Sequence, residues 1–268
     1  MGFDTDIALR DAGRLVFDLD VPAHWRVGEG ATNGGYVAAV ITGAMQRVVA
    51  EPARHPRSLT VHYLAACGPG PARVAVAVER QGRSLSTLTA RMTQGESTVA
   101  LALGAFGQAR PGLEFQHEPM PEAPPPEQVP AWSPGTDGPG FPGNWEYRMC
   151  VGARPFARAR EALSGGWIRP AQPRVLDAPH LAAMTDGWLP PVIALLDRAP
   201  GIVPTVDLTI HFRAAMPLPD AAPGDFSFAV FHSHVGAEGY WESDGIIWAR
   251  DGRVLAQARQ LAVFNMSR

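Results

Sequence analysis

Lysine is absent from this sequence, and all 23 of its Lys and Arg residues are arginines. A P-loop needs a lysine to bind nucleotide phosphates, and Schiff-base enzymes need a lysine side-chain amine. The absence of lysine therefore excludes both kinds of chemistry.

Cysteine is scarce as well. Cys67 and Cys150 are the two cysteines of the chain, and neither belongs to a CxxC pair or has a histidine at ligand spacing. The sequence therefore predicts neither a disulfide framework nor a zinc site, and we expect both thiols to lie in the core. His232 and His234 alternate along a predicted strand and share one face, but no third ligand accompanies them. We predict no metal site and no cofactor.

Long apolar segments and blocks of like charge are also missing. No apolar run reaches the length of about 18 residues that a membrane span needs. The N-terminal stretch MGFDTDIALR carries acids where a signal peptide carries bases. The net charge of -3 is spread along the chain, which gives no footprint for nucleic acid. We therefore expect a cytoplasmic protein with a small-molecule ligand and without nucleic-acid or membrane partners.

The chain does contain a repeat. The stretch LTVHYLAACGPG begins at Leu59, and the similar stretch LTIHFRAAMPLP begins at Leu208. Between the two copies, the segment from Arg110 to Gly143 is so rich in Pro and Gly that it excludes regular helix and sheet ladders. We therefore predict an N-terminal unit over 1–109, a linker over 110–143 and a C-terminal unit over 144–268.

Both halves show the same order of elements: strand structure, then an apolar helix, then four strands with two-residue alternation. The expected strands cover 14–20, 58–66, 72–80, 83–94 and 97–107 in the first half, and 144–151, 165–170, 205–215, 225–235, 239–250 and 253–264 in the second; the helices cover 34–50 and 180–198.

An antiparallel sheet wrapped around one apolar helix is the hotdog arrangement, and two copies make a double hotdog of the α+β class. A β-sandwich and a ferredoxin-like duplication are the competing folds. Neither places a single buried helix after the first strand of each half. Pairing also gives each copy a partner for the sheet edge and helix flank that it would otherwise expose.

Positions where one copy is polar and the other is not indicate where function was kept. Superposing the repeated motifs pairs three polar residues of the second copy with Gly or Pro in the first: Asp186 with Gly34, Thr205 with Pro56, and Gln260 with Gly104. Each polar residue alone has a structural explanation, as a solvated helix residue, a turn residue or an outward strand residue. Their apolar neighbours favour function, because buried polar groups need partners.

Six motifs carry a resemblance to a known family: NGGYVAA, LTVHYLAACGPG, GRSLSTLTARMTQ, MTDGWLP, PTVDLTIHFR and DGRVLAQARQ. In their order and spacing, the chain resembles the type II acyl-CoA thioesterases, which are double-hotdog enzymes that hydrolyse fatty acyl-CoA. The resemblance covers essentially the whole chain. It implies an acyl-CoA substrate, and by motif it places the family's catalytic triad on Asp186, Thr205 and Gln260.

Thioester hydrolysis needs a positioned water, an acceptor for its proton and donors for the oxyanion. We expect Asp186 to act as the base, with Thr205 and Gln260 holding the water in place. Direct attack by water is preferred to an acyl-enzyme, because neither cysteine has a predicted partner and the chain has no Gly-x-Ser-x-Gly elbow.

Substrate-binding residues are expected at the start of the first helix and beside the acid. Backbone N–H groups at Asn33, Gly34 and Gly35 are candidates for the oxyanion site, although the glycines also suit tight helix packing. Tyr36 and Trp188 are expected to line an acyl tunnel between the two halves.

The rival function is a double hotdog that binds acyl-CoA or another acyl ligand without hydrolysing it. Family members often continue the last motif as Gln-Glu-Gly, whereas this chain has Gln260-Leu261-Ala262. A hydratase motif of the form Gly-Asp-x-Asn-Pro-Leu-His is absent. We expect the chain to form a homodimer.

Overall fold

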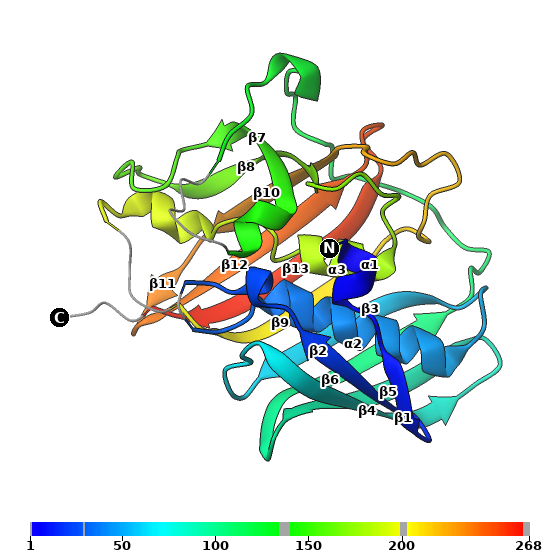
Figure 1. Cartoon of the computed structure of the whole chain (residues 1–268). Coiled ribbons are helices and arrows are strands. Elements are labelled where there is room, and N and C mark those ends of the chain that lie inside the picture. The colour runs from blue at the N-terminus through cyan, green and yellow to red at the C-terminus, as the bar shows by residue number, and fades with distance from the viewer. Residues whose placement is uncertain (1, 29, 134–139, 199–202, 265–268) are drawn as a thin grey trace.

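The computed structural model describes residues 2–28, 30–133, 140–198 and 203–264 (Figure 1). The first half contains α1 (Phe3–Asp6), β1 (Arg10–Gly13), β2 (Val16–Val21), α2 (Gly34–Val49), β3 (His55–Tyr63), β4 (Gly70–Gln81), β5 (Leu85–Gln94) and β6 (Ser97–Gly107). The second half contains β7 (Trp145–Gly152), β8 (Ala162–Pro170), α3 (Ala178–Met184), β9 (Thr205–Phe212), β10 (Ser227–Ser233), β11 (Gly236–Ala237), β12 (Tyr240–Trp248) and β13 (Val254–Val263). Short 3-10 helices cover Ala23–Trp25 (η1), Pro126–Gln128 (η2), Phe141–Asn144 (η3) and Pro191–Leu195 (η4).

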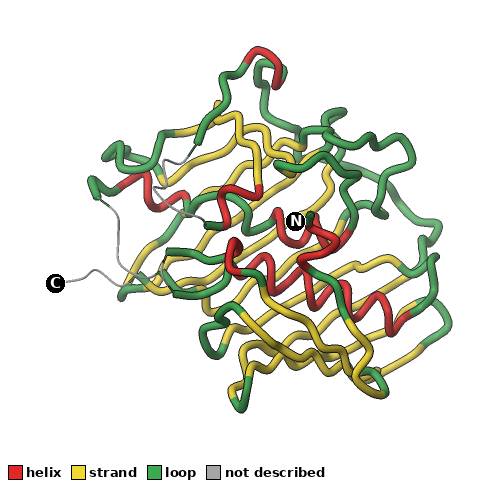
Figure 2. The backbone as a smooth tube through the Cα atoms, viewed as in Figure 1, coloured by secondary structure: helices red, strands yellow, loops and turns green. Residues whose placement is uncertain are grey.

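The strands of both halves form one sheet. Its order is β1-β2-β4-β5-β6-β3-β9-β13-β12-β10-β8-β7, with β11 paired to β12. The halves join through antiparallel β3 and β9, where Thr60 lies opposite Thr209 and their hydroxyl oxygens are 3.1 Å apart. Figure 2 shows the strands wrapping around the helices. The proposed boundaries of the two units and the linker stay a prediction.

Helix α2 confirms the first predicted helix. Asn33 caps it by accepting a hydrogen bond from the backbone N–H of Tyr36, and Ala50 ends it in the left-handed region with φ 48°. Ten of its sixteen residues are buried, because small and apolar side chains on all sides let it contact both the sheet and α3. Figure 1 shows α2 and α3 side by side over the middle of the sheet.

The predicted second helix over 180–198 is wrong. Helix α3 covers only seven residues and ends at Met184, and a separate 3-10 turn, η4, follows at Pro191–Leu195. Gly187 and the pair Pro190-Pro191 explain the break, since glycine is a weak helix former and proline lacks the N–H that continues a helix. Asp186 consequently lies in a turn after α3.

Matching bulges confirm two of the three pairings between the copies. On β9, the ladder to β13 pairs Leu208 with Gln260 but Thr205 with Ala262, so one residue of β9 is left over. The ladder from β3 to β6 repeats this pattern, with Leu59 opposite Gly104 and Pro56 opposite Phe106. The third pairing, of Gly34 with Asp186, is wrong: Gly34 begins α2, whereas Asp186 follows the end of α3.

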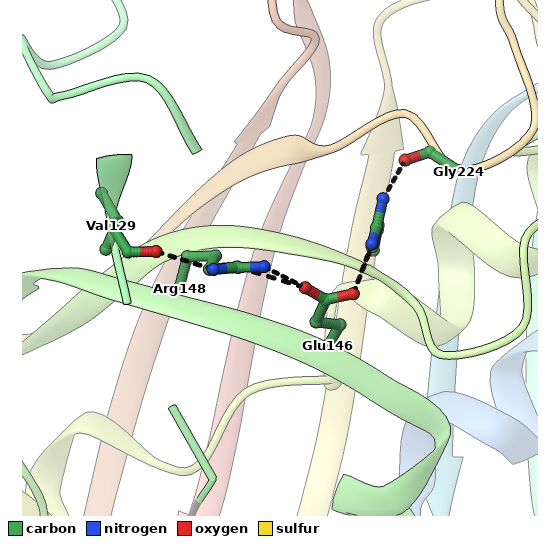
Figure 3. Close-up of polar contacts among 5 residues, drawn as sticks. Val129, Glu146, Arg148 and Gly224 are labelled. Carbon is green, nitrogen blue, oxygen red and sulfur yellow. Dashed lines mark hydrogen bonds and ion pairs between the residues drawn. The ribbon is translucent and has the colours of Figure 1, made fainter. Parts of the chain in front are cut away.

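The linker is attached to the second half by an arginine network. Arg148 donates to the carbonyl of Val129 in the linker at 2.9 Å and to Glu146 at 2.6 Å (Figure 3). Arg169 donates to the other carboxylate oxygen of Glu146 at 2.8 Å and to the carbonyl of Gly224 at 3.0 Å. Burial acts to raise the pKa of Glu146, but hydrogen bonds from Arg169 and Arg148 outweigh it and lower the pKa.

Replacing Glu146 with Gln is expected to lower the free energy of unfolding by about 1–2 kcal/mol, between the values for exposed and buried ion pairs. Both guanidinium groups would lose the charge that pairs them. Urea unfolding at neutral pH measures the change. Asp251→Asn is the control, because it breaks a more exposed pair with Arg253 and should have a much smaller effect. Equal losses for the two variants would contradict the role given to Glu146.

The two cysteines differ in exposure. Cys67 is buried, but Cys150 is exposed, contrary to expectation, because it sits at a bulge in β7 at the sheet edge.

Within the described ranges, no helix is long and apolar enough to cross a membrane. The rings of His232 and His234 lie 4.0 Å apart, and the described residues contain no cluster of three or more His, Cys, Asp or Glu suited to a metal.

Candidate active site

The carboxylate of Asp186 meets the start of α2. Its Oδ2 atom accepts hydrogen bonds from the side-chain amide of Asn33 and from the backbone N–H of Gly35, both at 2.9 Å. The same Asn33 amide donates to the backbone carbonyl of Asp186 at 2.9 Å. Because the N-terminus of a helix carries partial positive charge, this position stabilises the ionised carboxylate.

Close approach of α2 to α3 depends on Gly35. A Cβ atom at this position would lie 2.5 Å from the carbonyl oxygen of Ala183 and 2.9 Å from the Cβ of Asp186. Both contacts are too short for any larger residue. Glycine therefore brings the N–H of residue 35 within hydrogen-bonding distance of Asp186.

The second oxygen of Asp186 faces the other two predicted catalytic residues. Gln260 uses its side-chain amide to contact Asp186 Oδ1 at 3.3 Å and to donate to the hydroxyl oxygen of Thr205 at 2.6 Å. The carboxylate accepts only, which fixes the orientation of the Gln260 amide. The bulge in β9 puts Thr205 on the same inward face as Gln260, and without it the side chain would point the other way.

Burial and hydrogen bonding oppose each other at Asp186. Burial raises the pKa of its carboxyl to about 6, while hydrogen bonds from Gly35, Gln260 and Asn33 partly offset that rise. Asp186 is ionised at neutral pH but lies within reach of protonation, which is the property required of a general base. Asp186, Thr205 and Gln260 are all half-buried, so the cluster keeps access to solvent.

The residues expected to bind substrate are only partly brought to this cluster. The backbone N–H of Asn33 donates to the carbonyl of Trp25 at 2.8 Å and that of Gly35 donates to Asp186 at 2.9 Å, so neither is free for an oxyanion. Tyr36 lies fully buried in the core with its hydroxyl donating to the carbonyl of Asp6 at 2.7 Å. Trp188 is buried too, and its indole N–H donates to the Ser164 hydroxyl at 2.6 Å.

Two tyrosines at the site were not predicted from the sequence. Tyr63 donates to the carbonyl of Gly34, and Tyr147 donates to the carbonyl of Gly187, each at 2.7 Å. The repeat contained a signal for the first of them, because Tyr63 occupies the place of Phe212 in the second copy. Tyr147 had no comparable signal.

Comparison with known proteins identifies the family. A family model described as the acyl-CoA thioesterase N-terminal domain matches residues 21–107, and one described as the C-terminal domain matches residues 121–264. The chain belongs to the acyl-CoA thioesterase family. The resemblance inferred from the motifs is confirmed by these matches.

Similar proteins cover nearly the whole chain. An uncharacterized protein of Mycobacterium tuberculosis is 28% identical over 296 residues, covering 97% of each chain. The crystal structure of a conserved protein of unknown function with hot dog fold from Alicyclobacillus acidocaldarius has a TM-score of 0.89 and 27% identity, covering 99% of this chain and 98% of that one. An acyl-CoA thioesterase II from Mycobacterium marinum has a TM-score of 0.78 and 20% identity, covering 99% of both chains. The two solved structures confirm the double hotdog fold.

Proposed function

We propose that the protein hydrolyses an acyl-CoA to the free acid and CoA by direct attack of a water molecule. The observation that carries the proposal is the unequal environment of the two oxygens of Asp186. Oδ2 accepts hydrogen bonds from Asn33 and Gly35 at 2.9 Å, whereas the hydrogen bond that Oδ1 accepts from Gln260 is longer, at 3.3 Å. Oδ1 is therefore the oxygen placed to accept a proton from water.

Each of the three polar side chains has a separate task. The Gln260 amide donates hydrogen bonds to Thr205 and Asp186 and fixes these two groups relative to each other. The Thr205 hydroxyl oxygen accepts from Gln260, so its own proton can be donated to the oxygen of the water. Water held between Thr205 and Asp186 Oδ1 then presents a lone pair for attack.

In the reaction, Asp186 takes one proton from the water while the water oxygen bonds to the thioester carbonyl carbon. Collapse of the tetrahedral intermediate breaks the carbon–sulfur bond. The sulfur leaves with the proton held by Asp186, which restores the carboxylate. The products are the free acid and the CoA thiol, and no cofactor enters the balance.

A pH profile and an ester panel test this function together. Thiol release from acyl-CoA esters of increasing chain length is expected, with kcat/KM falling as pH drops below about 6, because protonation removes the base. Saturable binding of the esters without thiol release would overturn the proposal and favour a binding protein. Turnover that stays constant through pH 6 would overturn the role of Asp186. Cytoplasmic location and a homodimer stay predictions from the sequence.

A further inference from the structure

Two tyrosine hydroxyls, one from each half of the fold, hold glycine carbonyls beside Asp186. Tyr63, the last residue of β3, donates to the carbonyl of Gly34, the first residue of α2. Tyr147 on β7 donates to the carbonyl of Gly187, the residue that follows Asp186. The two hydrogen bonds therefore act on both sides of the contact between α2 and the carboxylate.

The negative charge of Asp186 acts on the hydroxyl groups of both tyrosines. Burial raises the pKa of Tyr63 and of Tyr147 well above the usual value, and the negative charge of Asp186 raises both further. Each phenol consequently stays neutral, with its proton available, across the pH range in which Asp186 titrates.

Gly34 is packed tightly between Tyr63 and Asp186, so a shift of Tyr63 would affect Asp186. A Cβ atom at Gly34 would lie 3.1 Å from the Tyr63 hydroxyl oxygen and 3.1 Å from Asp186 Oδ2. Gly34 is thus enclosed between the phenol and the carboxylate. A shift of Gly34 would move the next residue, Gly35, whose N–H binds Asp186 Oδ2.

Tyr147 is held firmly by its strand and its neighbours. Side chains alternate along β7, so Tyr147 points inward while Glu146 and Arg148 on either side form the ion-pair network of Figure 3. Its ring packs edge-on against Trp188 with centroids 5.2 Å apart. The hydroxyl thus sits at a fixed place under the turn that carries Asp186.

We propose that Tyr63 and Tyr147 are positioning residues for thioester hydrolysis, an inference that rests on the function proposed above. Their hydroxyls keep Gly34 and Gly187 in place. The donors at the start of α2 then stay hydrogen-bonded to Asp186 Oδ2, and Asp186 Oδ1 stays directed toward the attacking water. Phe212 occupies the place of Tyr63 in the second copy, which shows that this strand position accepts the ring without the hydroxyl.

The test compares Tyr63→Phe and Tyr147→Phe with a control, Thr42→Val. Thr42 is buried in the same helix and donates to the carbonyl of Ala38 at 2.8 Å, without contact to Asp186. Measurements are kcat and KM for one acyl-CoA ester, the pH profile, the melting temperature, and the ionisation of Asp186 by infrared difference spectroscopy against Asp186→Asn.

Both tyrosine variants are expected to lose about 10-fold to 100-fold in kcat with little change in KM, as for a misplaced catalytic group. The pKa of Asp186 should rise, because its donors are held less well, and the acid limb should move to higher pH. The Thr42→Val control removes a buried hydroxyl of α2 that lies away from Asp186, so it should leave the rate and the acid limb unchanged.

Loss of stability alone in both tyrosine variants, with the rate and the acid limb of the wild type, would overturn the positioning role. Absence of thiol release in the wild type would instead overturn the proposed function. In that case the infrared titration still decides, since an unchanged pKa of Asp186 in the variants overturns the inference. The two variants are independent, so either one suffices if the other does not fold.

Discussion

Replacing Asp186 with Asn is expected to lower thiol release from acyl-CoA esters by about 100-fold or more. In the variant, the amide oxygen would take the place of Oδ2, because that site faces two donors, from Asn33 and Gly35. The amide nitrogen would then occupy the place of Oδ1. An NH₂ group there donates to water and cannot accept its proton. Steady-state rates at pH 7.5 measure the loss.

The melting temperature separates this loss of chemistry from a loss of fold. The neutral amide would lose the 3.3 Å hydrogen bond from Gln260 but would also remove the charge that burial penalises, so the melting temperature should stay close to that of the wild type. Asp18→Asn is the matched control: it removes a surface carboxylate paired with Arg73 on the far strands of the first half and should keep the full rate. A wild-type rate in Asp186→Asn would rule out Asp186 as the base.

The Gly35→Ala variant is expected to lose both stability and activity. Its new methyl group would lie 2.5 Å from the carbonyl of Ala183, so α2 and α3 must move apart. Overpacking of this kind costs about 1–3 kcal/mol. The same movement takes the N–H of residue 35 away from Asp186, and a displacement of about 1 Å can cost 100-fold in rate. Urea unfolding and thiol release measure the two losses.

Another glycine of α2 provides the control. A Cβ atom at Gly43 would have its nearest neighbour, Pro179 Cγ, at 3.9 Å, which is ordinary contact. Gly43→Ala should therefore stabilise the protein by about 0.5–1 kcal/mol, the usual gain inside a helix, and keep the wild-type rate. If Gly35→Ala behaves like Gly43→Ala, the close packing of α2 on α3 is not what holds Asp186.

Local patterns were enough to predict most of the fold. Strand alternation, Gly-containing turns and the Pro- and Gly-rich linker are properties of short windows, and the structure places regular strands where they were expected. The prediction of a second helix over 180–198 was wrong because the apolar composition of this segment continues from α3 into η4. Composition of that kind does not distinguish a continuous helix from two short ones, and Gly187 with Pro190 decides for the latter.

Internal comparison of the repeat found the catalytic candidates for a physical reason. Thr205 and Gln260 stand at positions that the two copies share in register, so their polarity contrasts with Pro56 and Gly104 at equivalent places in the sheet. Asp186 was found by an alignment that the secondary structure does not support. Its motif, MTDGWLP, was therefore the more reliable indication.

The sequence by itself determined the duplication, the order of the strands along the chain and the three polar residues of the site. Each of these can be read from a short stretch of sequence or from a comparison of the two copies. Only the tertiary structure decided that Asn33 and Gly35 hold Asp186, and that Tyr63 and Tyr147 hold the glycines beside it. These contacts join segments far apart in the chain. They arise from the packing of α2 against the turn after α3 and of strands β3 and β7 against these segments, which no local pattern encodes.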